Sequence, residues 1–212
     1  MSFNDIREEV NKYYTQKVKT YGATPQGVDW NGEESQQLRF KELLNVVTDK
    51  DNPFSILDYG CGYGSLYGYM QNRYSDFRYT GFDISLEMID KAKSLYQSSN
   101  CNWINEDQKS VKYDYVVASG IFNVKMKTAE AEWKDYIIDT LHKINDLAIK
   151  GFSFNLLTSY SDKEYMRDYL YYADPLFLFD YCKRNFSKYV ALMHDYPLYE
   201  FSMFVKKKEV IG

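Results

Sequence analysis

The sequence is poor in the residues that most often build metal sites and disulfide frameworks. Its 212 residues include only three cysteines, Cys61, Cys101 and Cys182, and two histidines, His142 and His194. The cysteines are odd in number, widely spaced and without a CxxC pair. Neither a disulfide scaffold nor a zinc site is therefore predicted, and we expect no metal.

Long apolar runs and an excess of basic residues are also missing. No apolar run approaches the roughly 20 residues that a membrane-spanning helix needs, and the first residues are polar. The formal net charge is -4 and the sequence pI is about 5.3, whereas proteins that bind a nucleic-acid backbone usually carry a basic face. We therefore expect a cytoplasmic protein with no membrane and no nucleic-acid partner.

Prolines are few, four in all, and no repeat or low-complexity linker divides the chain. From residue 54 onward, strand patterns alternate with helix patterns, which predicts a parallel sheet with helices on both faces. The last two β-rich runs, 188–194 and 198–207, are joined by so short a loop that they must run antiparallel. We predict an α/β fold with a seven-stranded, mostly parallel sheet and an antiparallel closing hairpin.

The first 50 residues read as an extension of that fold. Apolar residues at helix spacing predict one helix over 3–20 and another over 34–47, with a turn-rich segment between them. The second helix is expected to bury four apolar positions: Leu38, Leu43, Leu44 and Val47. We expect residues 1–50 to form a helical cap on a domain that spans residues 51–212.

What the chain does have is a concentrated glycine motif, "ILDYGCGYGS", at residues 56–65. Gly60, Gly62 and Gly64 follow a predicted buried strand and precede a predicted helix. Glycine accepts positive φ and lets a backbone approach a ligand closely. Ligands of open α/β sheets lie outside the carboxyl ends of the strands, so the motif indicates a ligand against this loop. The dinucleotide fingerprint G-x-G-x-x-G has a different spacing.

The stretch "LDYGCGYG", together with the later "GFDISLEMIDKAK", resembles the class I S-adenosylmethionine-dependent methyltransferases. Specific motifs carry the resemblance over about residues 54–158. It implies that the methionine part of the cofactor passes along the glycine loop, at Asp58, Gly60, Cys61, Gly62 and Gly64. It also implies that Asp83, at the end of the second strand, accepts hydrogen bonds from both ribose hydroxyls, since a carboxylate offers two oxygens.

The same resemblance places further cofactor contacts. It puts Ile84 and Met88 beside the adenine or the loop, and an acid near the adenine amino group, for which Asp107 is preferred over Glu106. The residues after the fourth strand are expected where cofactor and acceptor meet: Ser119, Gly120 and Asn123. The text "SGIF" there is not the Asn/Asp-Pro-Pro-Tyr/Phe motif of nucleic-acid amino-methylating members, which argues against N-methylation of bases.

Candidates for the acceptor side are less specific. Trp30 is expected to form a wall of the site, and Arg39 has two readings, one as a partner of the cofactor carboxylate and one as a solvent-facing helix residue. His194 and Tyr196 lie in the loop between the last two strands and are candidate catalytic residues; the alternative, which the residues favour slightly, is an ordinary hairpin loop with polar side chains. Tyr160, after the fifth strand, is a further candidate contact.

These features predict an enzyme that transfers a methyl group from S-adenosylmethionine to an oxygen or nitrogen atom of a small-molecule acceptor. The enzyme is expected to be a monomer or a homodimer. Two alternatives stay open. One is a protein that holds the cofactor without transferring methyl. The other is an NAD(P)-dependent oxidoreductase, against which the glycine spacing argues.

Overall fold

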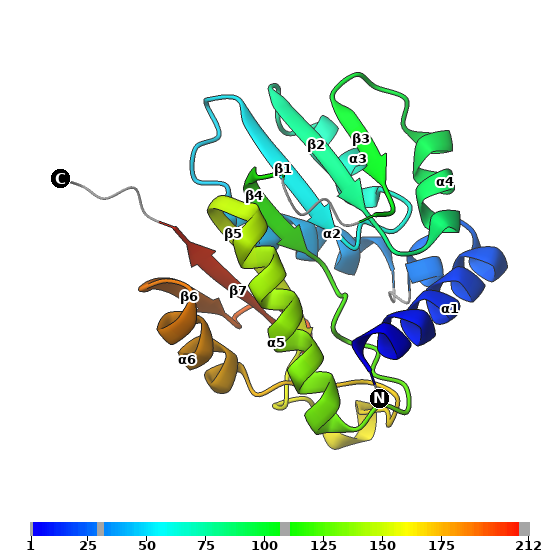
Figure 1. Cartoon of the computed structure of the whole chain (residues 1–212), viewed down its shortest axis with the longest axis vertical. Helices are drawn as coiled ribbons and strands as arrows, with labels where there is room; N and C mark the ends of the chain where they lie inside the picture. The colour runs from blue at the N-terminus through cyan, green and yellow to red at the C-terminus, as the bar shows by residue number, and fades with distance from the viewer. Residues whose placement is uncertain (1, 29–31, 107–110, 208–212) are drawn as a thin grey trace.

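The computed structural model describes residues 2–28, 32–106 and 111–207, and a single seven-stranded sheet lies at the centre of this part (Figure 1). The strand order across the sheet is β3-β2-β1-β4-β5-β7-β6. The strands are β1 Phe54–Tyr59, β2 Phe77–Phe82, β3 Cys101–Ile104, β4 Tyr113–Ala118, β5 Ala148–Leu157, β6 Tyr189–Met193 and β7 Glu200–Lys206. Strands β1 to β5 pair in parallel, whereas β7 runs antiparallel to both β5 and β6. The predicted fold class is confirmed.

Helices cover both faces of this sheet. The helices in the described residues are α1 Phe3–Tyr21, η1 Pro25–Val28, α2 Glu33–Leu43, η2 Leu44–Val46, α3 Ser65–Gln71, α4 Leu86–Leu95, α5 Glu130–Leu147, η3 Lys163–Tyr165 and α6 Pro175–Asn185. In Figure 1, α5 crosses in front of the sheet and α2 lies behind it. No helix in the described ranges is long and apolar enough to span a bilayer.

The helix ends follow from local sequence chemistry. Ser85 caps α4 by accepting a hydrogen bond from the Met88 N–H at 3.4 Å, as its position before an apolar-periodic run predicts. Asp174 caps α6 in the same way, and Pro175 occupies the first helical position, where a missing N–H does no harm. Both helices therefore begin at the residues that the sequence indicates.

The N-terminal extension passes from one face of the sheet to the other. Ile6 and Val10 of α1 are buried in the core that contains Trp133 of α5. Phe40 and Leu43 of α2 are buried in the opposite core, with the side chains of α3 and α4. Helices α1 and α2 therefore pack in the cores on opposite faces of the sheet.

The burial of α2 differs from the prediction at one position. Leu38 is only half-buried, whereas Gln36 and Arg39 are buried. The reason is that these polar side chains have partners inside the fold. The Gln36 amide donates to the Ser65 hydroxyl at 3.2 Å, and Arg39 pairs with Glu200 at 2.7 Å. Apolar periodicity alone does not register such partners.

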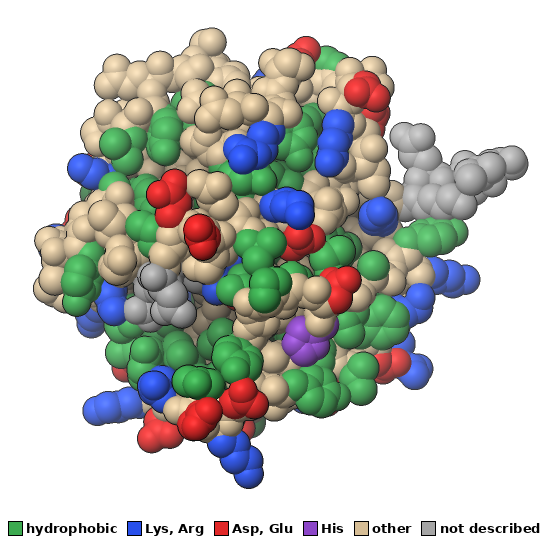
Figure 2. All heavy atoms as spheres, turned by 180° about the vertical axis from the view of Figure 1, so that it is seen from behind, with side chains coloured by type: hydrophobic (Ala, Val, Ile, Leu, Met, Phe, Trp, Pro, Cys, Tyr) green, Lys and Arg blue, Asp and Glu red, His purple; other side chains and the backbone are tan. Residues whose placement is uncertain are grey.

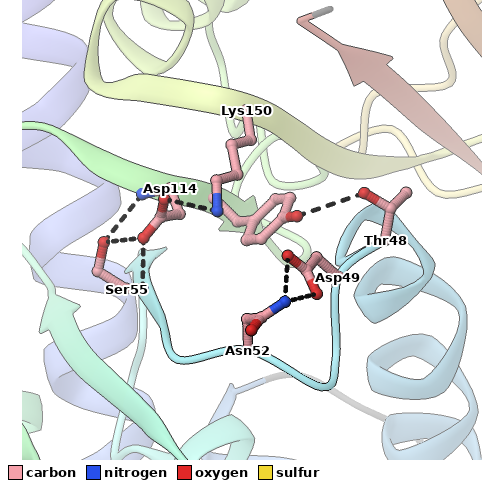
Figure 3. Close-up of polar contacts among 7 residues, drawn as sticks. Thr48, Asp49, Asn52, Ser55, Asp114 and Lys150 are labelled. Carbon is pink, nitrogen blue, oxygen red and sulfur yellow. Dashed lines mark hydrogen bonds and ion pairs between the residues drawn. The ribbon is translucent and has the colours of Figure 1, made fainter. Parts of the chain in front are cut away.

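A cluster of polar side chains connects three parallel strands near their amino ends (Figure 3). The Asp114 carboxylate accepts hydrogen bonds from the N–H and the hydroxyl of Ser55, each at 2.8 Å, and lies 3.1 Å from the Lys150 ammonium. Burial acts to raise the pKa of Asp114, but the Ser55 and Lys150 contacts outweigh it and hold the pKa below its usual range. This cluster joins β1, β4 and β5.

Replacing Asp114 by asparagine should lower the free energy of unfolding by about 2 kcal/mol at neutral pH, because the hydrogen bonds to a charged acceptor are lost. A folded-state pKa below the unfolded value means that this stability is present above about pH 4 and is lost as the pH falls through the folded pKa. Urea denaturation of both proteins between pH 7 and pH 3 checks this.

The matched control is Asp49→Asn, since Asp49 accepts only from the side chain of Asn52 in the same region. An exposed pair of this kind should change stability by less than about 0.5 kcal/mol. A loss for Asp114→Asn as small as that of the control would contradict the role given to Asp114.

Candidate functional site

Three strand ends meet at one edge of the sheet. In the register of β1 with β2, Tyr59 lies opposite Phe82, and Asp58 lies opposite Val117 of β4. The loops that begin at Gly60, Asp83 and Ser119 therefore leave the sheet side by side. This is the edge at which ligands of open α/β sheets bind.

A crevice runs along these three loops, and we call it the glycine crevice. It is lined by Val10, Tyr14, Val28, Gln36, Phe40, Asp58, Tyr59, Gly60, Cys61, Gly62, Ser65, Phe82, Asp83, Ile84, Met88, Ser119, Gly120, Ile121 and Tyr136. The structure thus brings together most of the residues predicted to bind a cofactor. The sequence predicts a helical cap, but it does not predict which residues of α1, η1 and α2 line this crevice.

The glycine loop is held in a conformation that requires glycine. Gly60 and Gly62 have φ values of 87° and 53°, in the left-handed region. A Cβ on Gly60 would lie 2.2 Å from a methyl carbon of Ile121, and one on Gly62 would lie 3.1 Å from Val28. The N–H groups of Gly60 and Cys61 both donate to the Phe82 carbonyl, at 2.7 and 2.9 Å. The loop is therefore fixed to β2 and presents bare backbone to the crevice.

Gly64 has a different role from the one predicted. It does not line the glycine crevice; a Cβ there would lie 2.5 Å from the ring of Trp103, and its φ is 86°. Gly64 is also the residue that precedes α3. Packing against Trp103 and the start of a helix account for this glycine without a ligand.

Asp83 connects the second strand to the glycine loop. One carboxylate oxygen accepts the Gly62 N–H and the other the Ser85 N–H, both at 2.8 Å. Burial raises the pKa of Asp83 to about 6, and these two hydrogen bonds oppose the rise. Because each carboxylate oxygen has two acceptor positions, each keeps one for a further donor. Asp83 can thus anchor the loop and accept two hydroxyl groups at once.

Asp58 lies deeper, at the end of β1. Its carboxyl accepts a hydrogen bond from the Tyr79 hydroxyl at 2.6 Å. Burial raises its pKa to about 7; the Tyr79 hydrogen bond opposes this, and the nearby Asp83 adds to it. Cys61 is buried as well, and burial raises the pKa of its thiol, which argues against a reactive thiolate.

Ser119 and Gly120 follow β4 on the far side of the crevice. The Ser119 hydroxyl oxygen is buried, and no hydrogen-bond partner for it is found in the described residues. Gly120 has a φ of 72°, and its N–H donates to the Asn155 side chain at 2.8 Å. A buried hydroxyl without a partner is uncommon and marks a position where a ligand group can bind.

Helix α1 closes the crevice from the side of α4. The Thr15 hydroxyl lies 2.8 Å from that of Ser85, and the Lys19 ammonium lies 3.1 Å from the Glu87 carboxylate. Tyr14 and Val28 then line the crevice next to Gly120. The extension therefore forms part of the wall.

A second cavity of about 530 Å³ adjoins the glycine crevice, and we call it the tyrosine cavity. Its lining consists of Tyr14, Val28, Arg39, Gly120, Asn123, Val124, Leu157, Ser161, Tyr165, Arg167, Tyr169, Leu170, Tyr172, Pro197, Leu198 and Tyr199. Tyr14, Val28 and Gly120 line both spaces. The two spaces therefore lie next to each other, and Gly120 belongs to the loop where the sequence predicts that cofactor and acceptor meet.

Buried polar side chains connect helix α2 to the loop that contains Gly120. Arg39 of α2 pairs with Glu200 of β7, and both side chains are almost fully buried. Burial raises the pKa of Glu200, and the neighbouring Arg39 and Asn155 oppose the rise only in part. Because Asn155 also holds the Gly120 N–H, the cap helix is connected to the loop after β4. The expectation of a solvent-facing Arg39 is wrong, and its partner within the protein is the Glu200 carboxylate.

The structure does not bring His194, Tyr196 and Tyr160 into either space. The loop between β6 and β7 lies at the predicted edge, but His194 is exposed, with its ring 6.0 Å from that of Tyr160. Tyr160 is itself 65% exposed. The Tyr196 hydroxyl lies 2.9 Å from that of Ser202, and burial raises its pKa. The loop contributes Pro197, Leu198 and Tyr199 instead.

The remaining predicted residues are placed as follows. Asn123 is buried, lines the tyrosine cavity, and its side-chain oxygen accepts the Leu157 N–H at 3.2 Å. Glu106 is exposed, whereas Asp107 and Trp30 lie outside the described residues. In the parts of the chain that the structure describes, no group of three or more His, Cys, Asp or Glu side chains could hold a metal ion.

Comparisons with known proteins agree with this geometry. A family model described as a methyltransferase domain matches residues 56–160. A protein of Mycobacterium tuberculosis (strain ATCC 25618 / H37Rv), which is named as a methyltransferase, is 50% identical over 165 residues, covering 77% of this chain and 99% of that protein. The chain belongs to the methyltransferase family. The resemblance of its glycine motif to the class I S-adenosylmethionine-dependent methyltransferases is thereby confirmed.

Other relatives of this methyltransferase are more distant. The malonyl-[acyl-carrier protein] O-methyltransferase of Acetivibrio thermocellus is 36% identical over 92 residues, which cover 41% of the chain and 32% of that protein. The crystal structure of magnesium protoporphyrin IX methyltransferase from Synechocystis PCC 6803, with bound SAM, superposes with a TM-score of 0.63. It is 18% identical and covers 97% of each chain, a likeness that shows the shared fold.

Proposed function

We propose that this methyltransferase transfers the methyl group of S-adenosylmethionine to an oxygen or nitrogen of a small molecule, with the cofactor in the glycine crevice and the acceptor in the tyrosine cavity. The observation that carries the proposal is that the two spaces are neighbours, with Tyr14, Val28 and Gly120 lining both. A cofactor that supplies a reactive methyl group leaves the protein to position the two reactants and exclude water.

The residues of the crevice suit an adenosyl sulfonium in three respects. The glycine loop presents no side chain at Gly60 and Gly62, where a Cβ would lie 2.2 Å from Ile121 and 3.1 Å from Val28. Asp83 keeps an acceptor position on each oxygen for the two hydroxyls of a ribose. The buried hydroxyl of Ser119 offers a donor and acceptor to a ligand group. When bound, S-adenosylmethionine would supply an electrophilic methyl carbon.

Isothermal titration calorimetry with S-adenosylmethionine, S-adenosylhomocysteine and NAD tests the cofactor part of this proposal. We expect the first two to bind and NAD not to bind, since the loop lacks the dinucleotide spacing. Formation of S-adenosylhomocysteine with a panel of small molecules tests the transfer. Binding without product across the panel would favour the alternative of a cofactor-binding protein, and binding of NAD alone would favour the oxidoreductase.

A further inference from the structure

The walls of the tyrosine cavity are rich in aromatic rings and carry polar as well as apolar groups. Five tyrosines line it: Tyr14, Tyr165, Tyr169, Tyr172 and Tyr199. The rings of Tyr165 and Tyr199 lie 5.6 Å apart between centroids, at an interplanar angle of 33°. Hydrophobic side chains, tyrosine included, also gather over the lower half of the face seen in Figure 2. A space of about 530 Å³ with such walls fits a compact molecule with a flat body.

Two of these tyrosines, Tyr172 and Tyr199, form hydrogen bonds to other groups of the protein through their hydroxyls. The Tyr172 hydroxyl accepts the Arg167 N–H at 2.9 Å. The Tyr199 hydroxyl donates to the Asp162 carboxylate at 2.5 Å, and this hydrogen bond raises the pKa of Tyr199 to about 12. A phenol with such a pKa stays protonated at neutral pH and cannot serve as a general base there.

The charge that borders the cavity is positive. Arg39 and Arg167 line it, and no Asp, Glu, His or Lys does so among the residues described. Arg39 is neutralised by Glu200 at 2.7 Å. One guanidinium nitrogen of Arg167 donates to the carbonyl oxygens of Glu164, at 3.0 Å, and Met166, at 2.9 Å. These contacts position the guanidinium of Arg167, whose side chain is exposed, and no carboxylate is paired with it among the residues that the structure describes.

Such a lining favours an acceptor that is nucleophilic without losing a proton. A hydroxyl or an ammonium group must be deprotonated before or during methylation, which calls for a base. A carboxylic acid is already ionised at neutral pH, because its pKa is near 4. A carboxylate also matches a guanidinium through charge-assisted hydrogen bonds. The cavity therefore provides what a carboxylate needs.

We propose that the acceptor is a carboxylate with a flat body, that Arg167 supplies the matching charge, and that the product is a methyl ester. This inference rests on the function proposed above. In the reaction, one carboxylate oxygen forms a bond to the methyl carbon, the bond from that carbon to sulfur breaks, and its electron pair stays on sulfur. The carboxylate and sulfonium charges cancel, so no proton is released and no base is required.

The chemical class of the product is tested by methyl transfer to an unfractionated acceptor pool. The protein is incubated with S-adenosylmethionine labelled in its methyl group and a low-molecular-weight extract of the source cells. We expect label in compounds from which mild alkali releases labelled methanol, because methyl esters hydrolyse whereas methyl ethers and methylamines do not.

The outcomes of that experiment separate the two proposals. Label that survives alkali would overturn the carboxylate and leave methyl transfer standing. Failure to transfer any label by a protein that still binds S-adenosylmethionine would refute the proposed function, and this inference with it. Arg167→Gln should reduce the alkali-labile label about tenfold at low acceptor concentration, with unchanged affinity for S-adenosylmethionine.

A binding experiment tests Arg167 without turnover. The probes are two fluorescent dyes with the same rings, the anion anilinonaphthalenesulfonate and the neutral phenylnaphthylamine, added to the protein saturated with S-adenosylhomocysteine. We expect Arg167→Gln to weaken binding of the anion about tenfold and leave the neutral dye unchanged. The control is Arg78→Gln, an exposed arginine on β2 that lies opposite Ser55, at the other end of the sheet.

The two dyes give an unambiguous answer. Equal losses for both dyes would indicate damage to the cavity, and no loss for the anion would indicate that Arg167 does not face it. No saturable binding of the anion to the wild-type protein would also overturn the proposal. Each of these results rejects Arg167 as the charge partner of an anionic acceptor.

Discussion

Replacing Asp83 by alanine should weaken the binding of S-adenosylhomocysteine by about a hundredfold or more. The carboxylate is proposed to accept both ribose hydroxyls, and hydrogen bonds to a charged group contribute about 1.5–3 kcal/mol each. Asp83 also holds the Gly62 N–H, so its loss loosens the loop on which the ligand lies. Calorimetry at pH 8, above the Asp83 pKa of about 6, measures the effect on the ionised carboxylate.

A double-mutant cycle separates ribose recognition from loop anchoring. The second variant is Asp83→Asn, which preserves shape, and the second ligand is the dideoxyribose analogue of S-adenosylhomocysteine. We expect the wild-type protein to prefer the ribose form strongly and Asp83→Asn to lose most of that preference. Equal discrimination by both proteins would show that Asp83 only anchors the loop.

The pH dependence of the same residue has a defined sign. The pKa of Asp83 in the folded protein, about 6, is above its unfolded value near 4. Its contribution to stability is therefore fully present below about pH 4 and is lost as the pH rises through about 6. Ribose binding requires the ionised form, so cofactor affinity should fall as the pH drops below about 6 while the contribution of Asp83 to the stability of the free protein increases.

Replacing Arg39 by methionine should lower the free energy of unfolding by about 3–5 kcal/mol, since it leaves the buried Glu200 carboxylate without its cation. The effect should be smaller at pH 5 than at pH 8. The pKa of Glu200 is raised by burial and rises further without Arg39, so the carboxyl becomes neutral more readily in acid. Urea denaturation at both pH values measures this.

The double variant Arg39→Met/Glu200→Met is the control for the ion pair. Replacing both partners by apolar side chains removes the buried charge, so most of the lost stability should return. If the double variant is as unstable as Arg39→Met, then packing of the arginine stem, and not an unpaired charge, explains the loss. A loss below about 1 kcal/mol for Arg39→Met would contradict the account of this pair.

The fold could be predicted almost entirely because its signals are local. Alternating strand and helix periods gave the element order, and the short loop between the last two β-rich runs required antiparallel closing strands. Ser85 as a cap and Pro175 at a first helical turn mark helix starts to within a residue. The exception was α2, where Gln36 and Arg39 are buried because of partners distant in sequence.

The crevice could be predicted where residues lie at strand ends. Gly60, Asp83 and Ser119 each follow directly on a strand, so a parallel sheet brings them together without further information. Gly64 shows the limit of that argument. Gly64 belongs to the same motif, but a side chain there would collide with the ring of Trp103. Trp103 lies in β3, 39 residues away in the chain.

The tyrosine cavity could not be predicted, since no period or motif marks it. Its walls include Tyr165, Arg167 and Tyr172, which belong to an irregular segment after β5. In such a segment, secondary-structure propensity does not predict the direction of a side chain. The sequence predicts His194 as a candidate catalytic residue instead, although that side chain is exposed. Side-chain direction in loops depends on tertiary contacts, which a single sequence does not show.

The central claim is that the cofactor lies along the glycine loop with its ribose on Asp83, and a crystal structure of the protein with S-adenosylhomocysteine tests it most directly. We predict the sulfur beside Gly60 and Gly62, near Gly120, and both ribose hydroxyls within hydrogen-bond distance of the Asp83 oxygens. Ribose hydroxyls more than about 3.5 Å from that carboxylate, or a cofactor bound elsewhere on the protein, would contradict it.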